Sequence, residues 1–564
     1  MIKKVTPGEF FTANLPHQFL LLFFFIIVSG CGSLALGQDI SWDLLNYHFY
    51  NGYAFLHHRL WQDVAPAMMQ TYLNPYLDVL NYAIISISNP RMAVFLLGIN
   101  SAIIGFFLYK TAIILFSSLS PSRQTAAASF SVYIGMTGVA SVSLLGTATN
   151  DVNVALLIVV AVYCLLKALA TPVNYPVHWI MVAAFLAGSA VGFKLTAATY
   201  VLGLLIGLIV SYGHSRECKK SVAYFILFSI LGFVLVDGHW MWMLYQHFQN
   251  PFFPYYNNIF HSVFAPYVSF NLSPAEIRPH WQQYIFFPYY VAVGSNTFFS
   301  ERALRDPRMA AVFIMTIIAV LTYCFQKYQT NYLKVQQVIT KKKLPIAWRF
   351  VVAYFCVSYV AWLLEFAVYR YLLPLELLTG IIIVYLAQFI LPSVGLRRVF
   401  LSALLVVFVM STHYPDWGRM KIGPAYFTMN VPRIPPHSIV VIAAVPLAYT
   451  IPFFSEDTRF IGMTFVGLGE DISLAHHLPE DKHRKLLKEV MTQLIQNSTQ
   501  SPIYSLTIQH NGPANKLTVF QTIRNNKRTF AILRHFDLIR DEDRCQTFST
   551  NMGDILQLCP LRKT

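Results

Sequence analysis

Residues 19–36 read FLLLFFFIIVSGCGSLAL and contain no charged side chain. A helix needs roughly 17–25 mainly apolar residues to cross the hydrocarbon core of a bilayer. Similar runs recur along the first three quarters of the chain. The sequence therefore predicts about eleven transmembrane helices, at 19–36, 93–116, 126–145, 152–169, 179–192, 197–211, 222–236, 309–323, 350–364, 371–389 and 399–410.

The composition also indicates lipid surroundings. Of the 564 residues, 56% are hydrophobic and only 12% are charged, whereas a soluble domain carries about 25% charged residues. The polar surface is too small for a water-soluble protein of this length unless lipid covers much of it. We therefore predict an α-helical, multi-pass integral membrane protein that contacts membrane lipids directly.

The basic residues indicate the orientation. Clusters at Lys3–Lys4, 216–220, 327–343 and Arg397–Arg398 fall in alternate connections between the predicted helices. Lysine and arginine accumulate on the cytoplasmic side, so the amino terminus is expected inside. This distribution explains the net charge of +15 without nucleic acid as a partner. We expect a bacterial inner-membrane protein whose loops 37–91 and 239–308, and whose tail, face the periplasm.

The first apolar run has a second interpretation. Val28-Ser29-Gly30-Cys31 follows a basic start and an apolar core, as a lipoprotein cleavage site would. Cleavage would leave the chain anchored through Cys31, with the later helices unchanged. A helix that ends in small residues produces the same letters, so both interpretations stay open.

The tail differs in composition from the rest. Residues 1–412 are predicted to form the membrane domain, and residues 413–564 a small α/β domain outside the membrane. Alternating apolar residues predict strands, and helical spacing predicts one helix at 478–496; the strands are expected at 438–444, 459–465, 502–509, 529–536 and 555–558. Cys545 and Cys559 are expected to form a disulfide, because such bonds persist in oxidising compartments; the alternative is two unpaired thiols.

The first outer loop carries the strongest candidates for chemistry. Asp39 and Asp43 follow the first helix, and Asp43 opens a stretch that is expected to be helical. In a helix Asn46 and Tyr47 share a face with Asp43, because residues three and four apart are neighbours; His48 follows directly. The alternative is that Asp43 only caps the helix.

Further charged residues stand at the outer ends of later helices. Asp151 directly precedes the run at 152–169, and a carboxylate at this depth is costly unless it is paired or functional. Lys194, Glu365 and Arg370 also lie near the outer boundary. A lysine or arginine there can hold a phosphate. The alternatives are a helix cap for Asp151 and snorkelling toward headgroups for the cations.

In this arrangement the chain resembles the GT-C superfamily, the polytopic glycosyltransferases that use polyprenyl-phosphate sugars. Within it, the chain is most similar to protein O-mannosyltransferases and lipid A aminoarabinose transferases. The resemblance implies that Asp43 is the catalytic carboxylate, with Asp39 as a weaker candidate and Asp151 as the second acid. It also implies that Lys194 and Arg370 bind the donor phosphate.

The remaining expectations concern the acceptor and the reaction. Asn46, Tyr47, His48 and Glu365 are expected to position the sugar or its acceptor, which can be a glycan, a lipid or a protein. The superfamily often has Asp-Glu in the first loop, whereas Leu44 follows Asp43. No metal ligands are assigned for this reason, and a divalent metal stays open. A transporter, a lipid-linked sugar flippase or a polysaccharide polymerase or ligase are the alternative functions.

Overall fold

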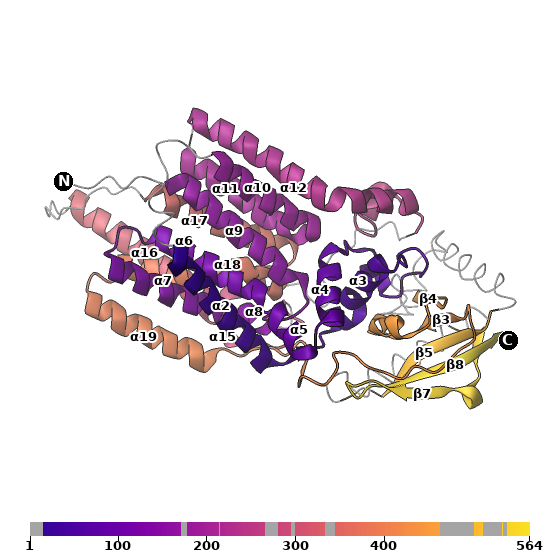
Figure 1. Ribbon diagram of the computed structural model, residues 1–564. Helices are drawn as coiled ribbons and strands as arrows, with labels where there is room; N and C mark the ends of the chain where they lie inside the picture. Colours follow the sequence, from indigo (N-terminus) through magenta and orange to yellow (C-terminus); the bar gives the residue numbers. More distant parts are fainter. Residues whose placement is uncertain are drawn as a thin grey trace.

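The fold consists of a helical bundle and a small sheet that lies at one end of it (Figure 1). The computed structural model describes residues 15–170, 177–213, 215–264, 280–294, 299–332, 344–462, 501–510, 512, 533 and 538–563. The predicted helix at 478–496 and most of the predicted strand at 529–536 lie outside these residues.

Each of the eleven predicted spans coincides with helical structure. Nine helical segments of the described chain are long and apolar enough to cross a membrane. They are α2 (Leu15–Leu36), α5 with α6 (Pro90–Leu97, Ile99–Leu115), α9 (Asn150–Ala170), η3 with α11 (Leu195–Ala197, Ala198–Tyr212), α12 (Arg216–Phe248), α16 (Arg308–Tyr332), α17 (Ile346–Glu365), η4 with α18 (Tyr369–Leu372, Leu373–Ile390) and α19 (Val394–Ser411). The protein is thus a multi-pass membrane protein.

The other two predicted spans are shorter helices. Residues 179–192 lie in α10 (Val177–Phe193), while 126–145 divides into α7 (Pro121–Met136) and the short α8 (Val139–Ser143). Small residues let α10 pack closely on α12: an added Cβ at Gly188 would lie 1.9 Å from the Ser229 carbonyl oxygen. Such close approach of backbones is typical of helix packing in membranes.

The two outer loops contain short helices. The first holds β1 (Gln38–Asp39), the π-helical turn η1 (Leu44–His48), α3 (Phe49–Leu56), η2 (Met68–Tyr72) and α4 (Tyr76–Ile87). The second holds α13 (Asn257–Phe260), α14 (Trp281–Ile285) and α15 (Phe287–Val293). Figure 1 shows α3 and α4 between the bundle and the sheet.

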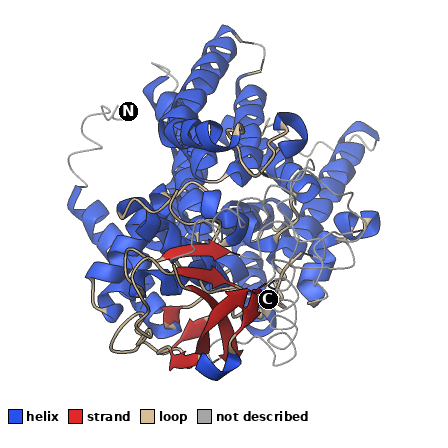
Figure 2. Cartoon of the chain, turned by 90° about the vertical axis from the view of Figure 1, so that its right-hand side faces the viewer, coloured by secondary structure: helices blue, strands red, loops and turns tan. Residues whose placement is uncertain are grey.

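The carboxyl-terminal part forms one mixed sheet (Figure 2). Its strand order is β4-β3-β5-β8-β6, and β7 also pairs with β8. β3 is parallel to β4 and β5, whereas β8 is antiparallel to its neighbours. The strands are β3 (Ile439–Ile442), β4 (Arg459–Gly462), β5 (Ile503–His510), β6 (Leu538–Arg540), β7 (Gln546–Ser549) and β8 (Ile555–Lys563). The predicted strands at 438–444, 459–465, 502–509 and 555–558 correspond to β3, β4, β5 and β8, and residues 463–465 lie outside the described part of the chain.

The first outer loop is anchored to this sheet. Arg59 donates hydrogen bonds to the carbonyl oxygens of Glu456 and Thr458 and forms a buried ion pair with Asp63 at 2.9 Å. Asp63 accepts a hydrogen bond from the Phe460 N–H at 2.9 Å. Since η1 and α3 also pack against the 3-10 helix η5 (Ala448–Phe453), the sheet supports the segment that carries Asp43.

A second connection lies beside the first helix. β1 pairs with β2 (Arg419–Met420), and the Arg419 guanidinium donates to the carbonyl oxygens of Ser143 and Leu145 at the end of α8. These contacts satisfy carbonyl groups that the end of a helix leaves without partners. The tail is therefore joined both to the first loop and to the bundle.

Cys545 and Cys559 form a disulfide at a sequence separation of 14 residues. The bond ties the start of β7 to β8. We expect the double variant Cys545→Ser/Cys559→Ser to lower the stability of the sheet by roughly 3 kcal/mol, because the bond restricts a loop of about 15 residues in the unfolded chain. Protease resistance of the tail, compared with that of the equally conservative Cys164→Ser variant, measures the effect. Equal resistance in both variants would contradict it.

Candidate functional site

Arg370 is the centre of a charged cluster at the outer end of the bundle. It belongs to the short helix η4, between α17 and α18. Its guanidinium pairs with the Asp43 carboxylate, and its Nη1 lies 3.8 Å from the Asp151 Oδ2. Its Nε lies 3.7 Å from the Glu301 Oε1. Arg370 thus joins the first outer loop, the start of α9 and the second outer loop.

Lys194 completes the cluster. This residue has extended backbone between α10 and η3, and its Nζ lies 2.5 Å from the Asp151 Oδ1. The same ammonium group stands 4.2 Å from the centre of the Tyr371 ring, and the Arg370 guanidinium 5.3 Å from it. A cation near an aromatic face is attracted by the ring quadrupole. Asp43, Asp151, Lys194 and Arg370, predicted separately from the sequence, therefore meet at one place.

The cluster is partly open to a ligand. The side chains of Asp43, Arg370 and Lys194 are 13%, 17% and 20% exposed, whereas that of Asp151 is 4% exposed. Glu301 is the most exposed member, at 34%. Within the described part of the chain, the buried Nε of Arg370 has no hydrogen-bond partner. Donor capacity is thus available at the centre of the cluster.

The charges of the cluster set the state of Asp43. Burial alone would raise the pKa of the Asp43 carboxyl, but it is outweighed by the charge of Arg370 together with the charge of His48, the hydrogen bond from Arg370 and the charge of Lys194. The net effect is a pKa below the ordinary value for aspartate. Asp43 is therefore an ionised carboxylate that faces a guanidinium.

The capping explanation does not account for Asp43. It stands at the N-cap position of η1, but its side chain makes no hydrogen bond to the free N–H groups there. Its carboxylate points to Arg370 instead. The turn that follows is a π-helix, a conformation often found at functional sites, and nothing in the sequence pattern indicated it.

Asp39 lies apart from this cluster. Its carboxylate is completely buried and accepts hydrogen bonds from the N–H groups of Ser41 and Ala148, at 2.9 and 2.8 Å. Both oxygens therefore already have backbone donors. The geometry assigns Asp39 to holding the loop in place, and it leaves Asp43 as the carboxylate of the first loop that faces the cations.

The expected acceptor-positioning residues take different places. Asn46, Tyr47 and His48 are buried in η1, beside Asp43. The Asn46 amide donates to the Ala67 carbonyl at 3.3 Å, and burial together with the charge of Asp43 raises the pKa of Tyr47 well above its usual range. Glu365 is exposed at the end of α17; no ion pair or hydrogen bond among the described residues joins it to the cluster.

Three features of the site were not predicted. Glu301 lies in the second outer loop, outside any regular element, so no pattern singled it out. Asp78 lies 2.6 Å from the His48 Nδ1 and also accepts a hydrogen bond from Asn150. Glu376 is completely buried in α18. Glu376 lies within the apolar run at 371–389, and this position could have identified it from the sequence, because carboxylates inside a membrane are usually functional or paired.

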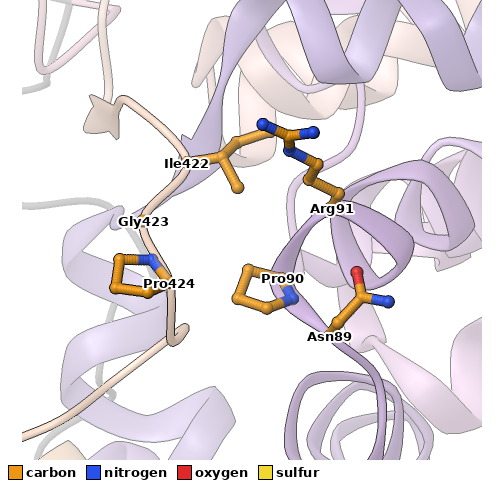
Figure 3. A pocket seen from close by; sticks show the side chains of 6 residues that line it. All are labelled: Asn89, Pro90, Arg91, Ile422, Gly423 and Pro424. Atoms are coloured by element: carbon orange, nitrogen blue, oxygen red, sulfur yellow. The ribbon is translucent and has the colours of Figure 1, made fainter.

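Outside the charged cluster, the described part of the chain has two further candidate sites, and each has fewer groups suited to catalysis. A hollow of about 380 Å³ lies between the start of α5 and the segment after β2, where Pro90 and Pro424 face each other beside Arg91 (Figure 3). None of the cluster residues lines it. Glu542, Cys545 and Cys559 stand close enough to hold a metal ion, but both sulfurs belong to the disulfide. Asp43 and Asp151 face the cations Arg370 and Lys194.

Comparison with known proteins gives distant structural likenesses. ArnT from Cupriavidus metallidurans bound to undecaprenyl phosphate is 14% identical with a TM-score of 0.42, over 70% of this chain and 64% of that chain. ArnT from the same organism in the apo state is 12% identical with a TM-score of 0.43, over 97% of this chain and 98% of that chain. The Archaeoglobus fulgidus oligosaccharyltransferase in the apo form is 11% identical with a TM-score of 0.46, over 89% of this chain and 70% of that chain.

No protein-family model matches the chain, and no curated protein matches it.

Proposed function

We propose that the protein is a membrane glycosyltransferase that moves a sugar from a polyprenyl-phosphate donor to an acceptor on the outer face of a bacterial inner membrane. The observation that supports this most is the meeting of Asp43 and Asp151 with Arg370 and Lys194. It supplies a general base and two phosphate-binding cations within a few ångströms, next to helices that can contact a lipid tail.

The donor phosphate binds to Arg370 and Lys194. Arginine can hold a phosphate through two parallel hydrogen bonds, and lysine adds a point charge. Without a ligand, the three carboxylates of the cluster outnumber its two cations. Glu301 is the most exposed carboxylate and lies 3.7 Å from Arg370. We infer that the phosphate displaces Glu301 and occupies its place at Arg370.

Asp43 acts as general base toward the acceptor. The acceptor oxygen or nitrogen attacks the anomeric carbon as its proton passes to the Asp43 carboxylate. The bond between that carbon and the phosphate oxygen breaks, and the electron pair leaves with the polyprenyl phosphate. Arg370 and Lys194 stabilise the charge that develops on this oxygen, which is the electrostatic part of the catalysis.

Phosphate binding also prepares the base. While Asp43 is paired with Arg370 its pKa is depressed, and a carboxylate with a low pKa takes protons poorly. A phosphate that attracts Arg370 weakens this pair, so that burial then raises the basicity of Asp43. Binding of the donor and activation of the acceptor are thereby coupled through one guanidinium.

The acceptor is a glycan, a lipid or a protein, positioned by Asn46, Tyr47 and His48 in η1. A polysaccharide polymerase or ligase would use the same chemistry with a growing glycan as acceptor. The purified protein, incubated with a panel of polyprenyl-phosphate sugars and candidate acceptors, should release the polyprenyl phosphate. Absence of release across the panel would count against the proposal.

This coupling has a pH signature. Activity requires the ionised form of Asp43, so the rate should persist as the pH falls until the lowered pKa of Asp43 is reached. In Arg370→Gln burial is no longer opposed by this charge, and the pKa of Asp43 should rise. The acid limb of kcat/KM should therefore lie at higher pH in the variant. An acid limb at the same pH in both proteins would mean that another group sets it.

A further inference from the structure

A buried tyrosine lies directly beside Arg370 and joins two carboxylates. The hydroxyl of Tyr369 lies 3.0 Å from the Asp306 Oδ2 and 3.0 Å from the Glu376 Oε2. The side chains of all three residues are completely buried. A hydroxyl carries one proton, so it cannot donate fully to both oxygens unless the group holds a second, shared proton.

Each carboxylate is also fixed by other donors. Asp306 pairs with Arg308 at 3.0 Å and accepts from the Val139 N–H. Glu376 accepts from the N–H groups of Ala140 and Ser141, at 2.9 and 2.8 Å, and from the Ser141 hydroxyl. These N–H groups belong to the first turn of α8. The bridge thus connects α8, the start of α16, η4 and α18 through fully buried groups.

Nearby contacts hold the backbone on both sides of Arg370. The Tyr369 N–H donates to the Phe299 carbonyl at 2.8 Å, two residues before Glu301. On the other side, the Tyr200 hydroxyl donates to the Tyr371 carbonyl. Arg370 therefore stands on a short helix that is tied to the bundle at each neighbour, although its own side chain is partly open to ligand.

We propose that Tyr369 is a positioning residue, whose bridge between Asp306 and Glu376 sets the place of Arg370 for the donor phosphate. The inference rests on the proposed function, in which Arg370 binds that phosphate. Buried polar groups with all partners in place fix one arrangement, whereas a missing partner leaves the others unsatisfied. Removal of the Tyr369 hydroxyl leaves two carboxylates facing each other and should allow η4 to shift.

The test compares two tyrosine hydroxyls. Tyr369→Phe keeps the ring, which packs near Phe287, and removes only the bridge. Tyr354→Phe is the matched control, because Tyr354 is equally buried and its hydroxyl has no hydrogen-bond partner within the described chain. We expect Tyr369→Phe to weaken binding of polyprenyl phosphate, and to raise the KM for the donor, by about tenfold with kcat changed much less. Tyr354→Phe should leave both unchanged.

A second pair of variants distinguishes loss of the hydrogen-bonded bridge from loss of folding. Glu376→Gln keeps the volume and can still hydrogen-bond to Tyr369, whereas Glu376→Ala cannot. The glutamine variant keeps one oxygen, which can still accept from Tyr369 and from the Ala140 N–H, but its NH2 group cannot accept from Ser141. It should therefore bind polyprenyl phosphate more tightly than the alanine variant, which should bind as weakly as Tyr369→Phe. The polyprenol without phosphate serves as the binding control for each protein. Unchanged phosphate affinity in Tyr369→Phe, or equal losses in Glu376→Gln and Glu376→Ala, would overturn the inference.

Binding and turnover separate the two proposals. If the parent protein binds polyprenyl phosphate but transfers no sugar, the proposed function fails while the role of Tyr369 is still measured by affinity. If it transfers sugar and Tyr369→Phe behaves as the parent in both assays, only the positioning inference fails.

Discussion

Asp43→Asn is expected to lower turnover by at least about 10²-fold, the usual range for loss of a general base. The amide keeps the size of the side chain and can still contact Arg370, but it cannot take up a proton. The detergent-purified variant should elute and melt as the parent does, because the Asp43 side chain is partly open and caps no helix. The measurement is the rate of polyprenyl-phosphate release at saturating donor.

The matched control for this substitution is Asp543→Asn. Asp543 is exposed in the turn η6 (Glu542–Arg544), in the tail, and it should tolerate the same chemical change without effect on rate. Turnover of Asp43→Asn within a few-fold of that control would remove Asp43 from the reaction.

Arg370→Gln is expected to raise the KM for the donor on the order of 10²-fold, as loss of charge-assisted hydrogen bonds to phosphate predicts. Among the described residues of the cluster, the variant leaves Lys194 as the one cation beside Asp43, Asp151 and Glu301, so the cluster repels a phosphate. We also expect kcat to fall, because the leaving oxygen loses its main stabilising charge.

Arg302→Gln provides the comparison for this second variant. Arg302 lies in the same outer loop as Glu301, next to it in sequence, and its side chain is exposed. A general loss of positive charge near the membrane would weaken both variants alike. Equal donor KM values in Arg370→Gln and Arg302→Gln would contradict a specific phosphate site.

The membrane part of the fold could be predicted because apolar length is a local property of the sequence. All eleven predicted spans are helical, and the alternation of charged connections brings Asp43, Asp151, Lys194 and Arg370 to one side. Their ion pairs could not be predicted, since Asp43 and Arg370 are 327 residues apart. Asp39 and Asp43 also looked alike in sequence; only the backbone donors around Asp39 separate them.

The limits of sequence reasoning are clearest in the second outer loop and the tail. Glu301 stands in irregular backbone, so periodicity offered no reason to choose it. Strand alternation predicted β3, β4, β5 and β8, but the parallel pairing of β3 with β5 depends on contacts across more than 60 residues. The hydrogen bond from Arg59 to the Thr458 carbonyl likewise joins residues 399 positions apart.

The most direct test of the proposed function follows the sugar and the lipid together. Protein reconstituted in vesicles receives a polyprenyl-phosphate sugar that is labelled on the sugar, with acceptor on the side of loops 37–91 and 239–308. The proposal predicts that label moves to the acceptor while polyprenyl phosphate appears in equal amount, and that Asp43→Asn abolishes both. Label that stays on the lipid but appears on the opposite face of the vesicle would contradict it, because that result describes a flippase.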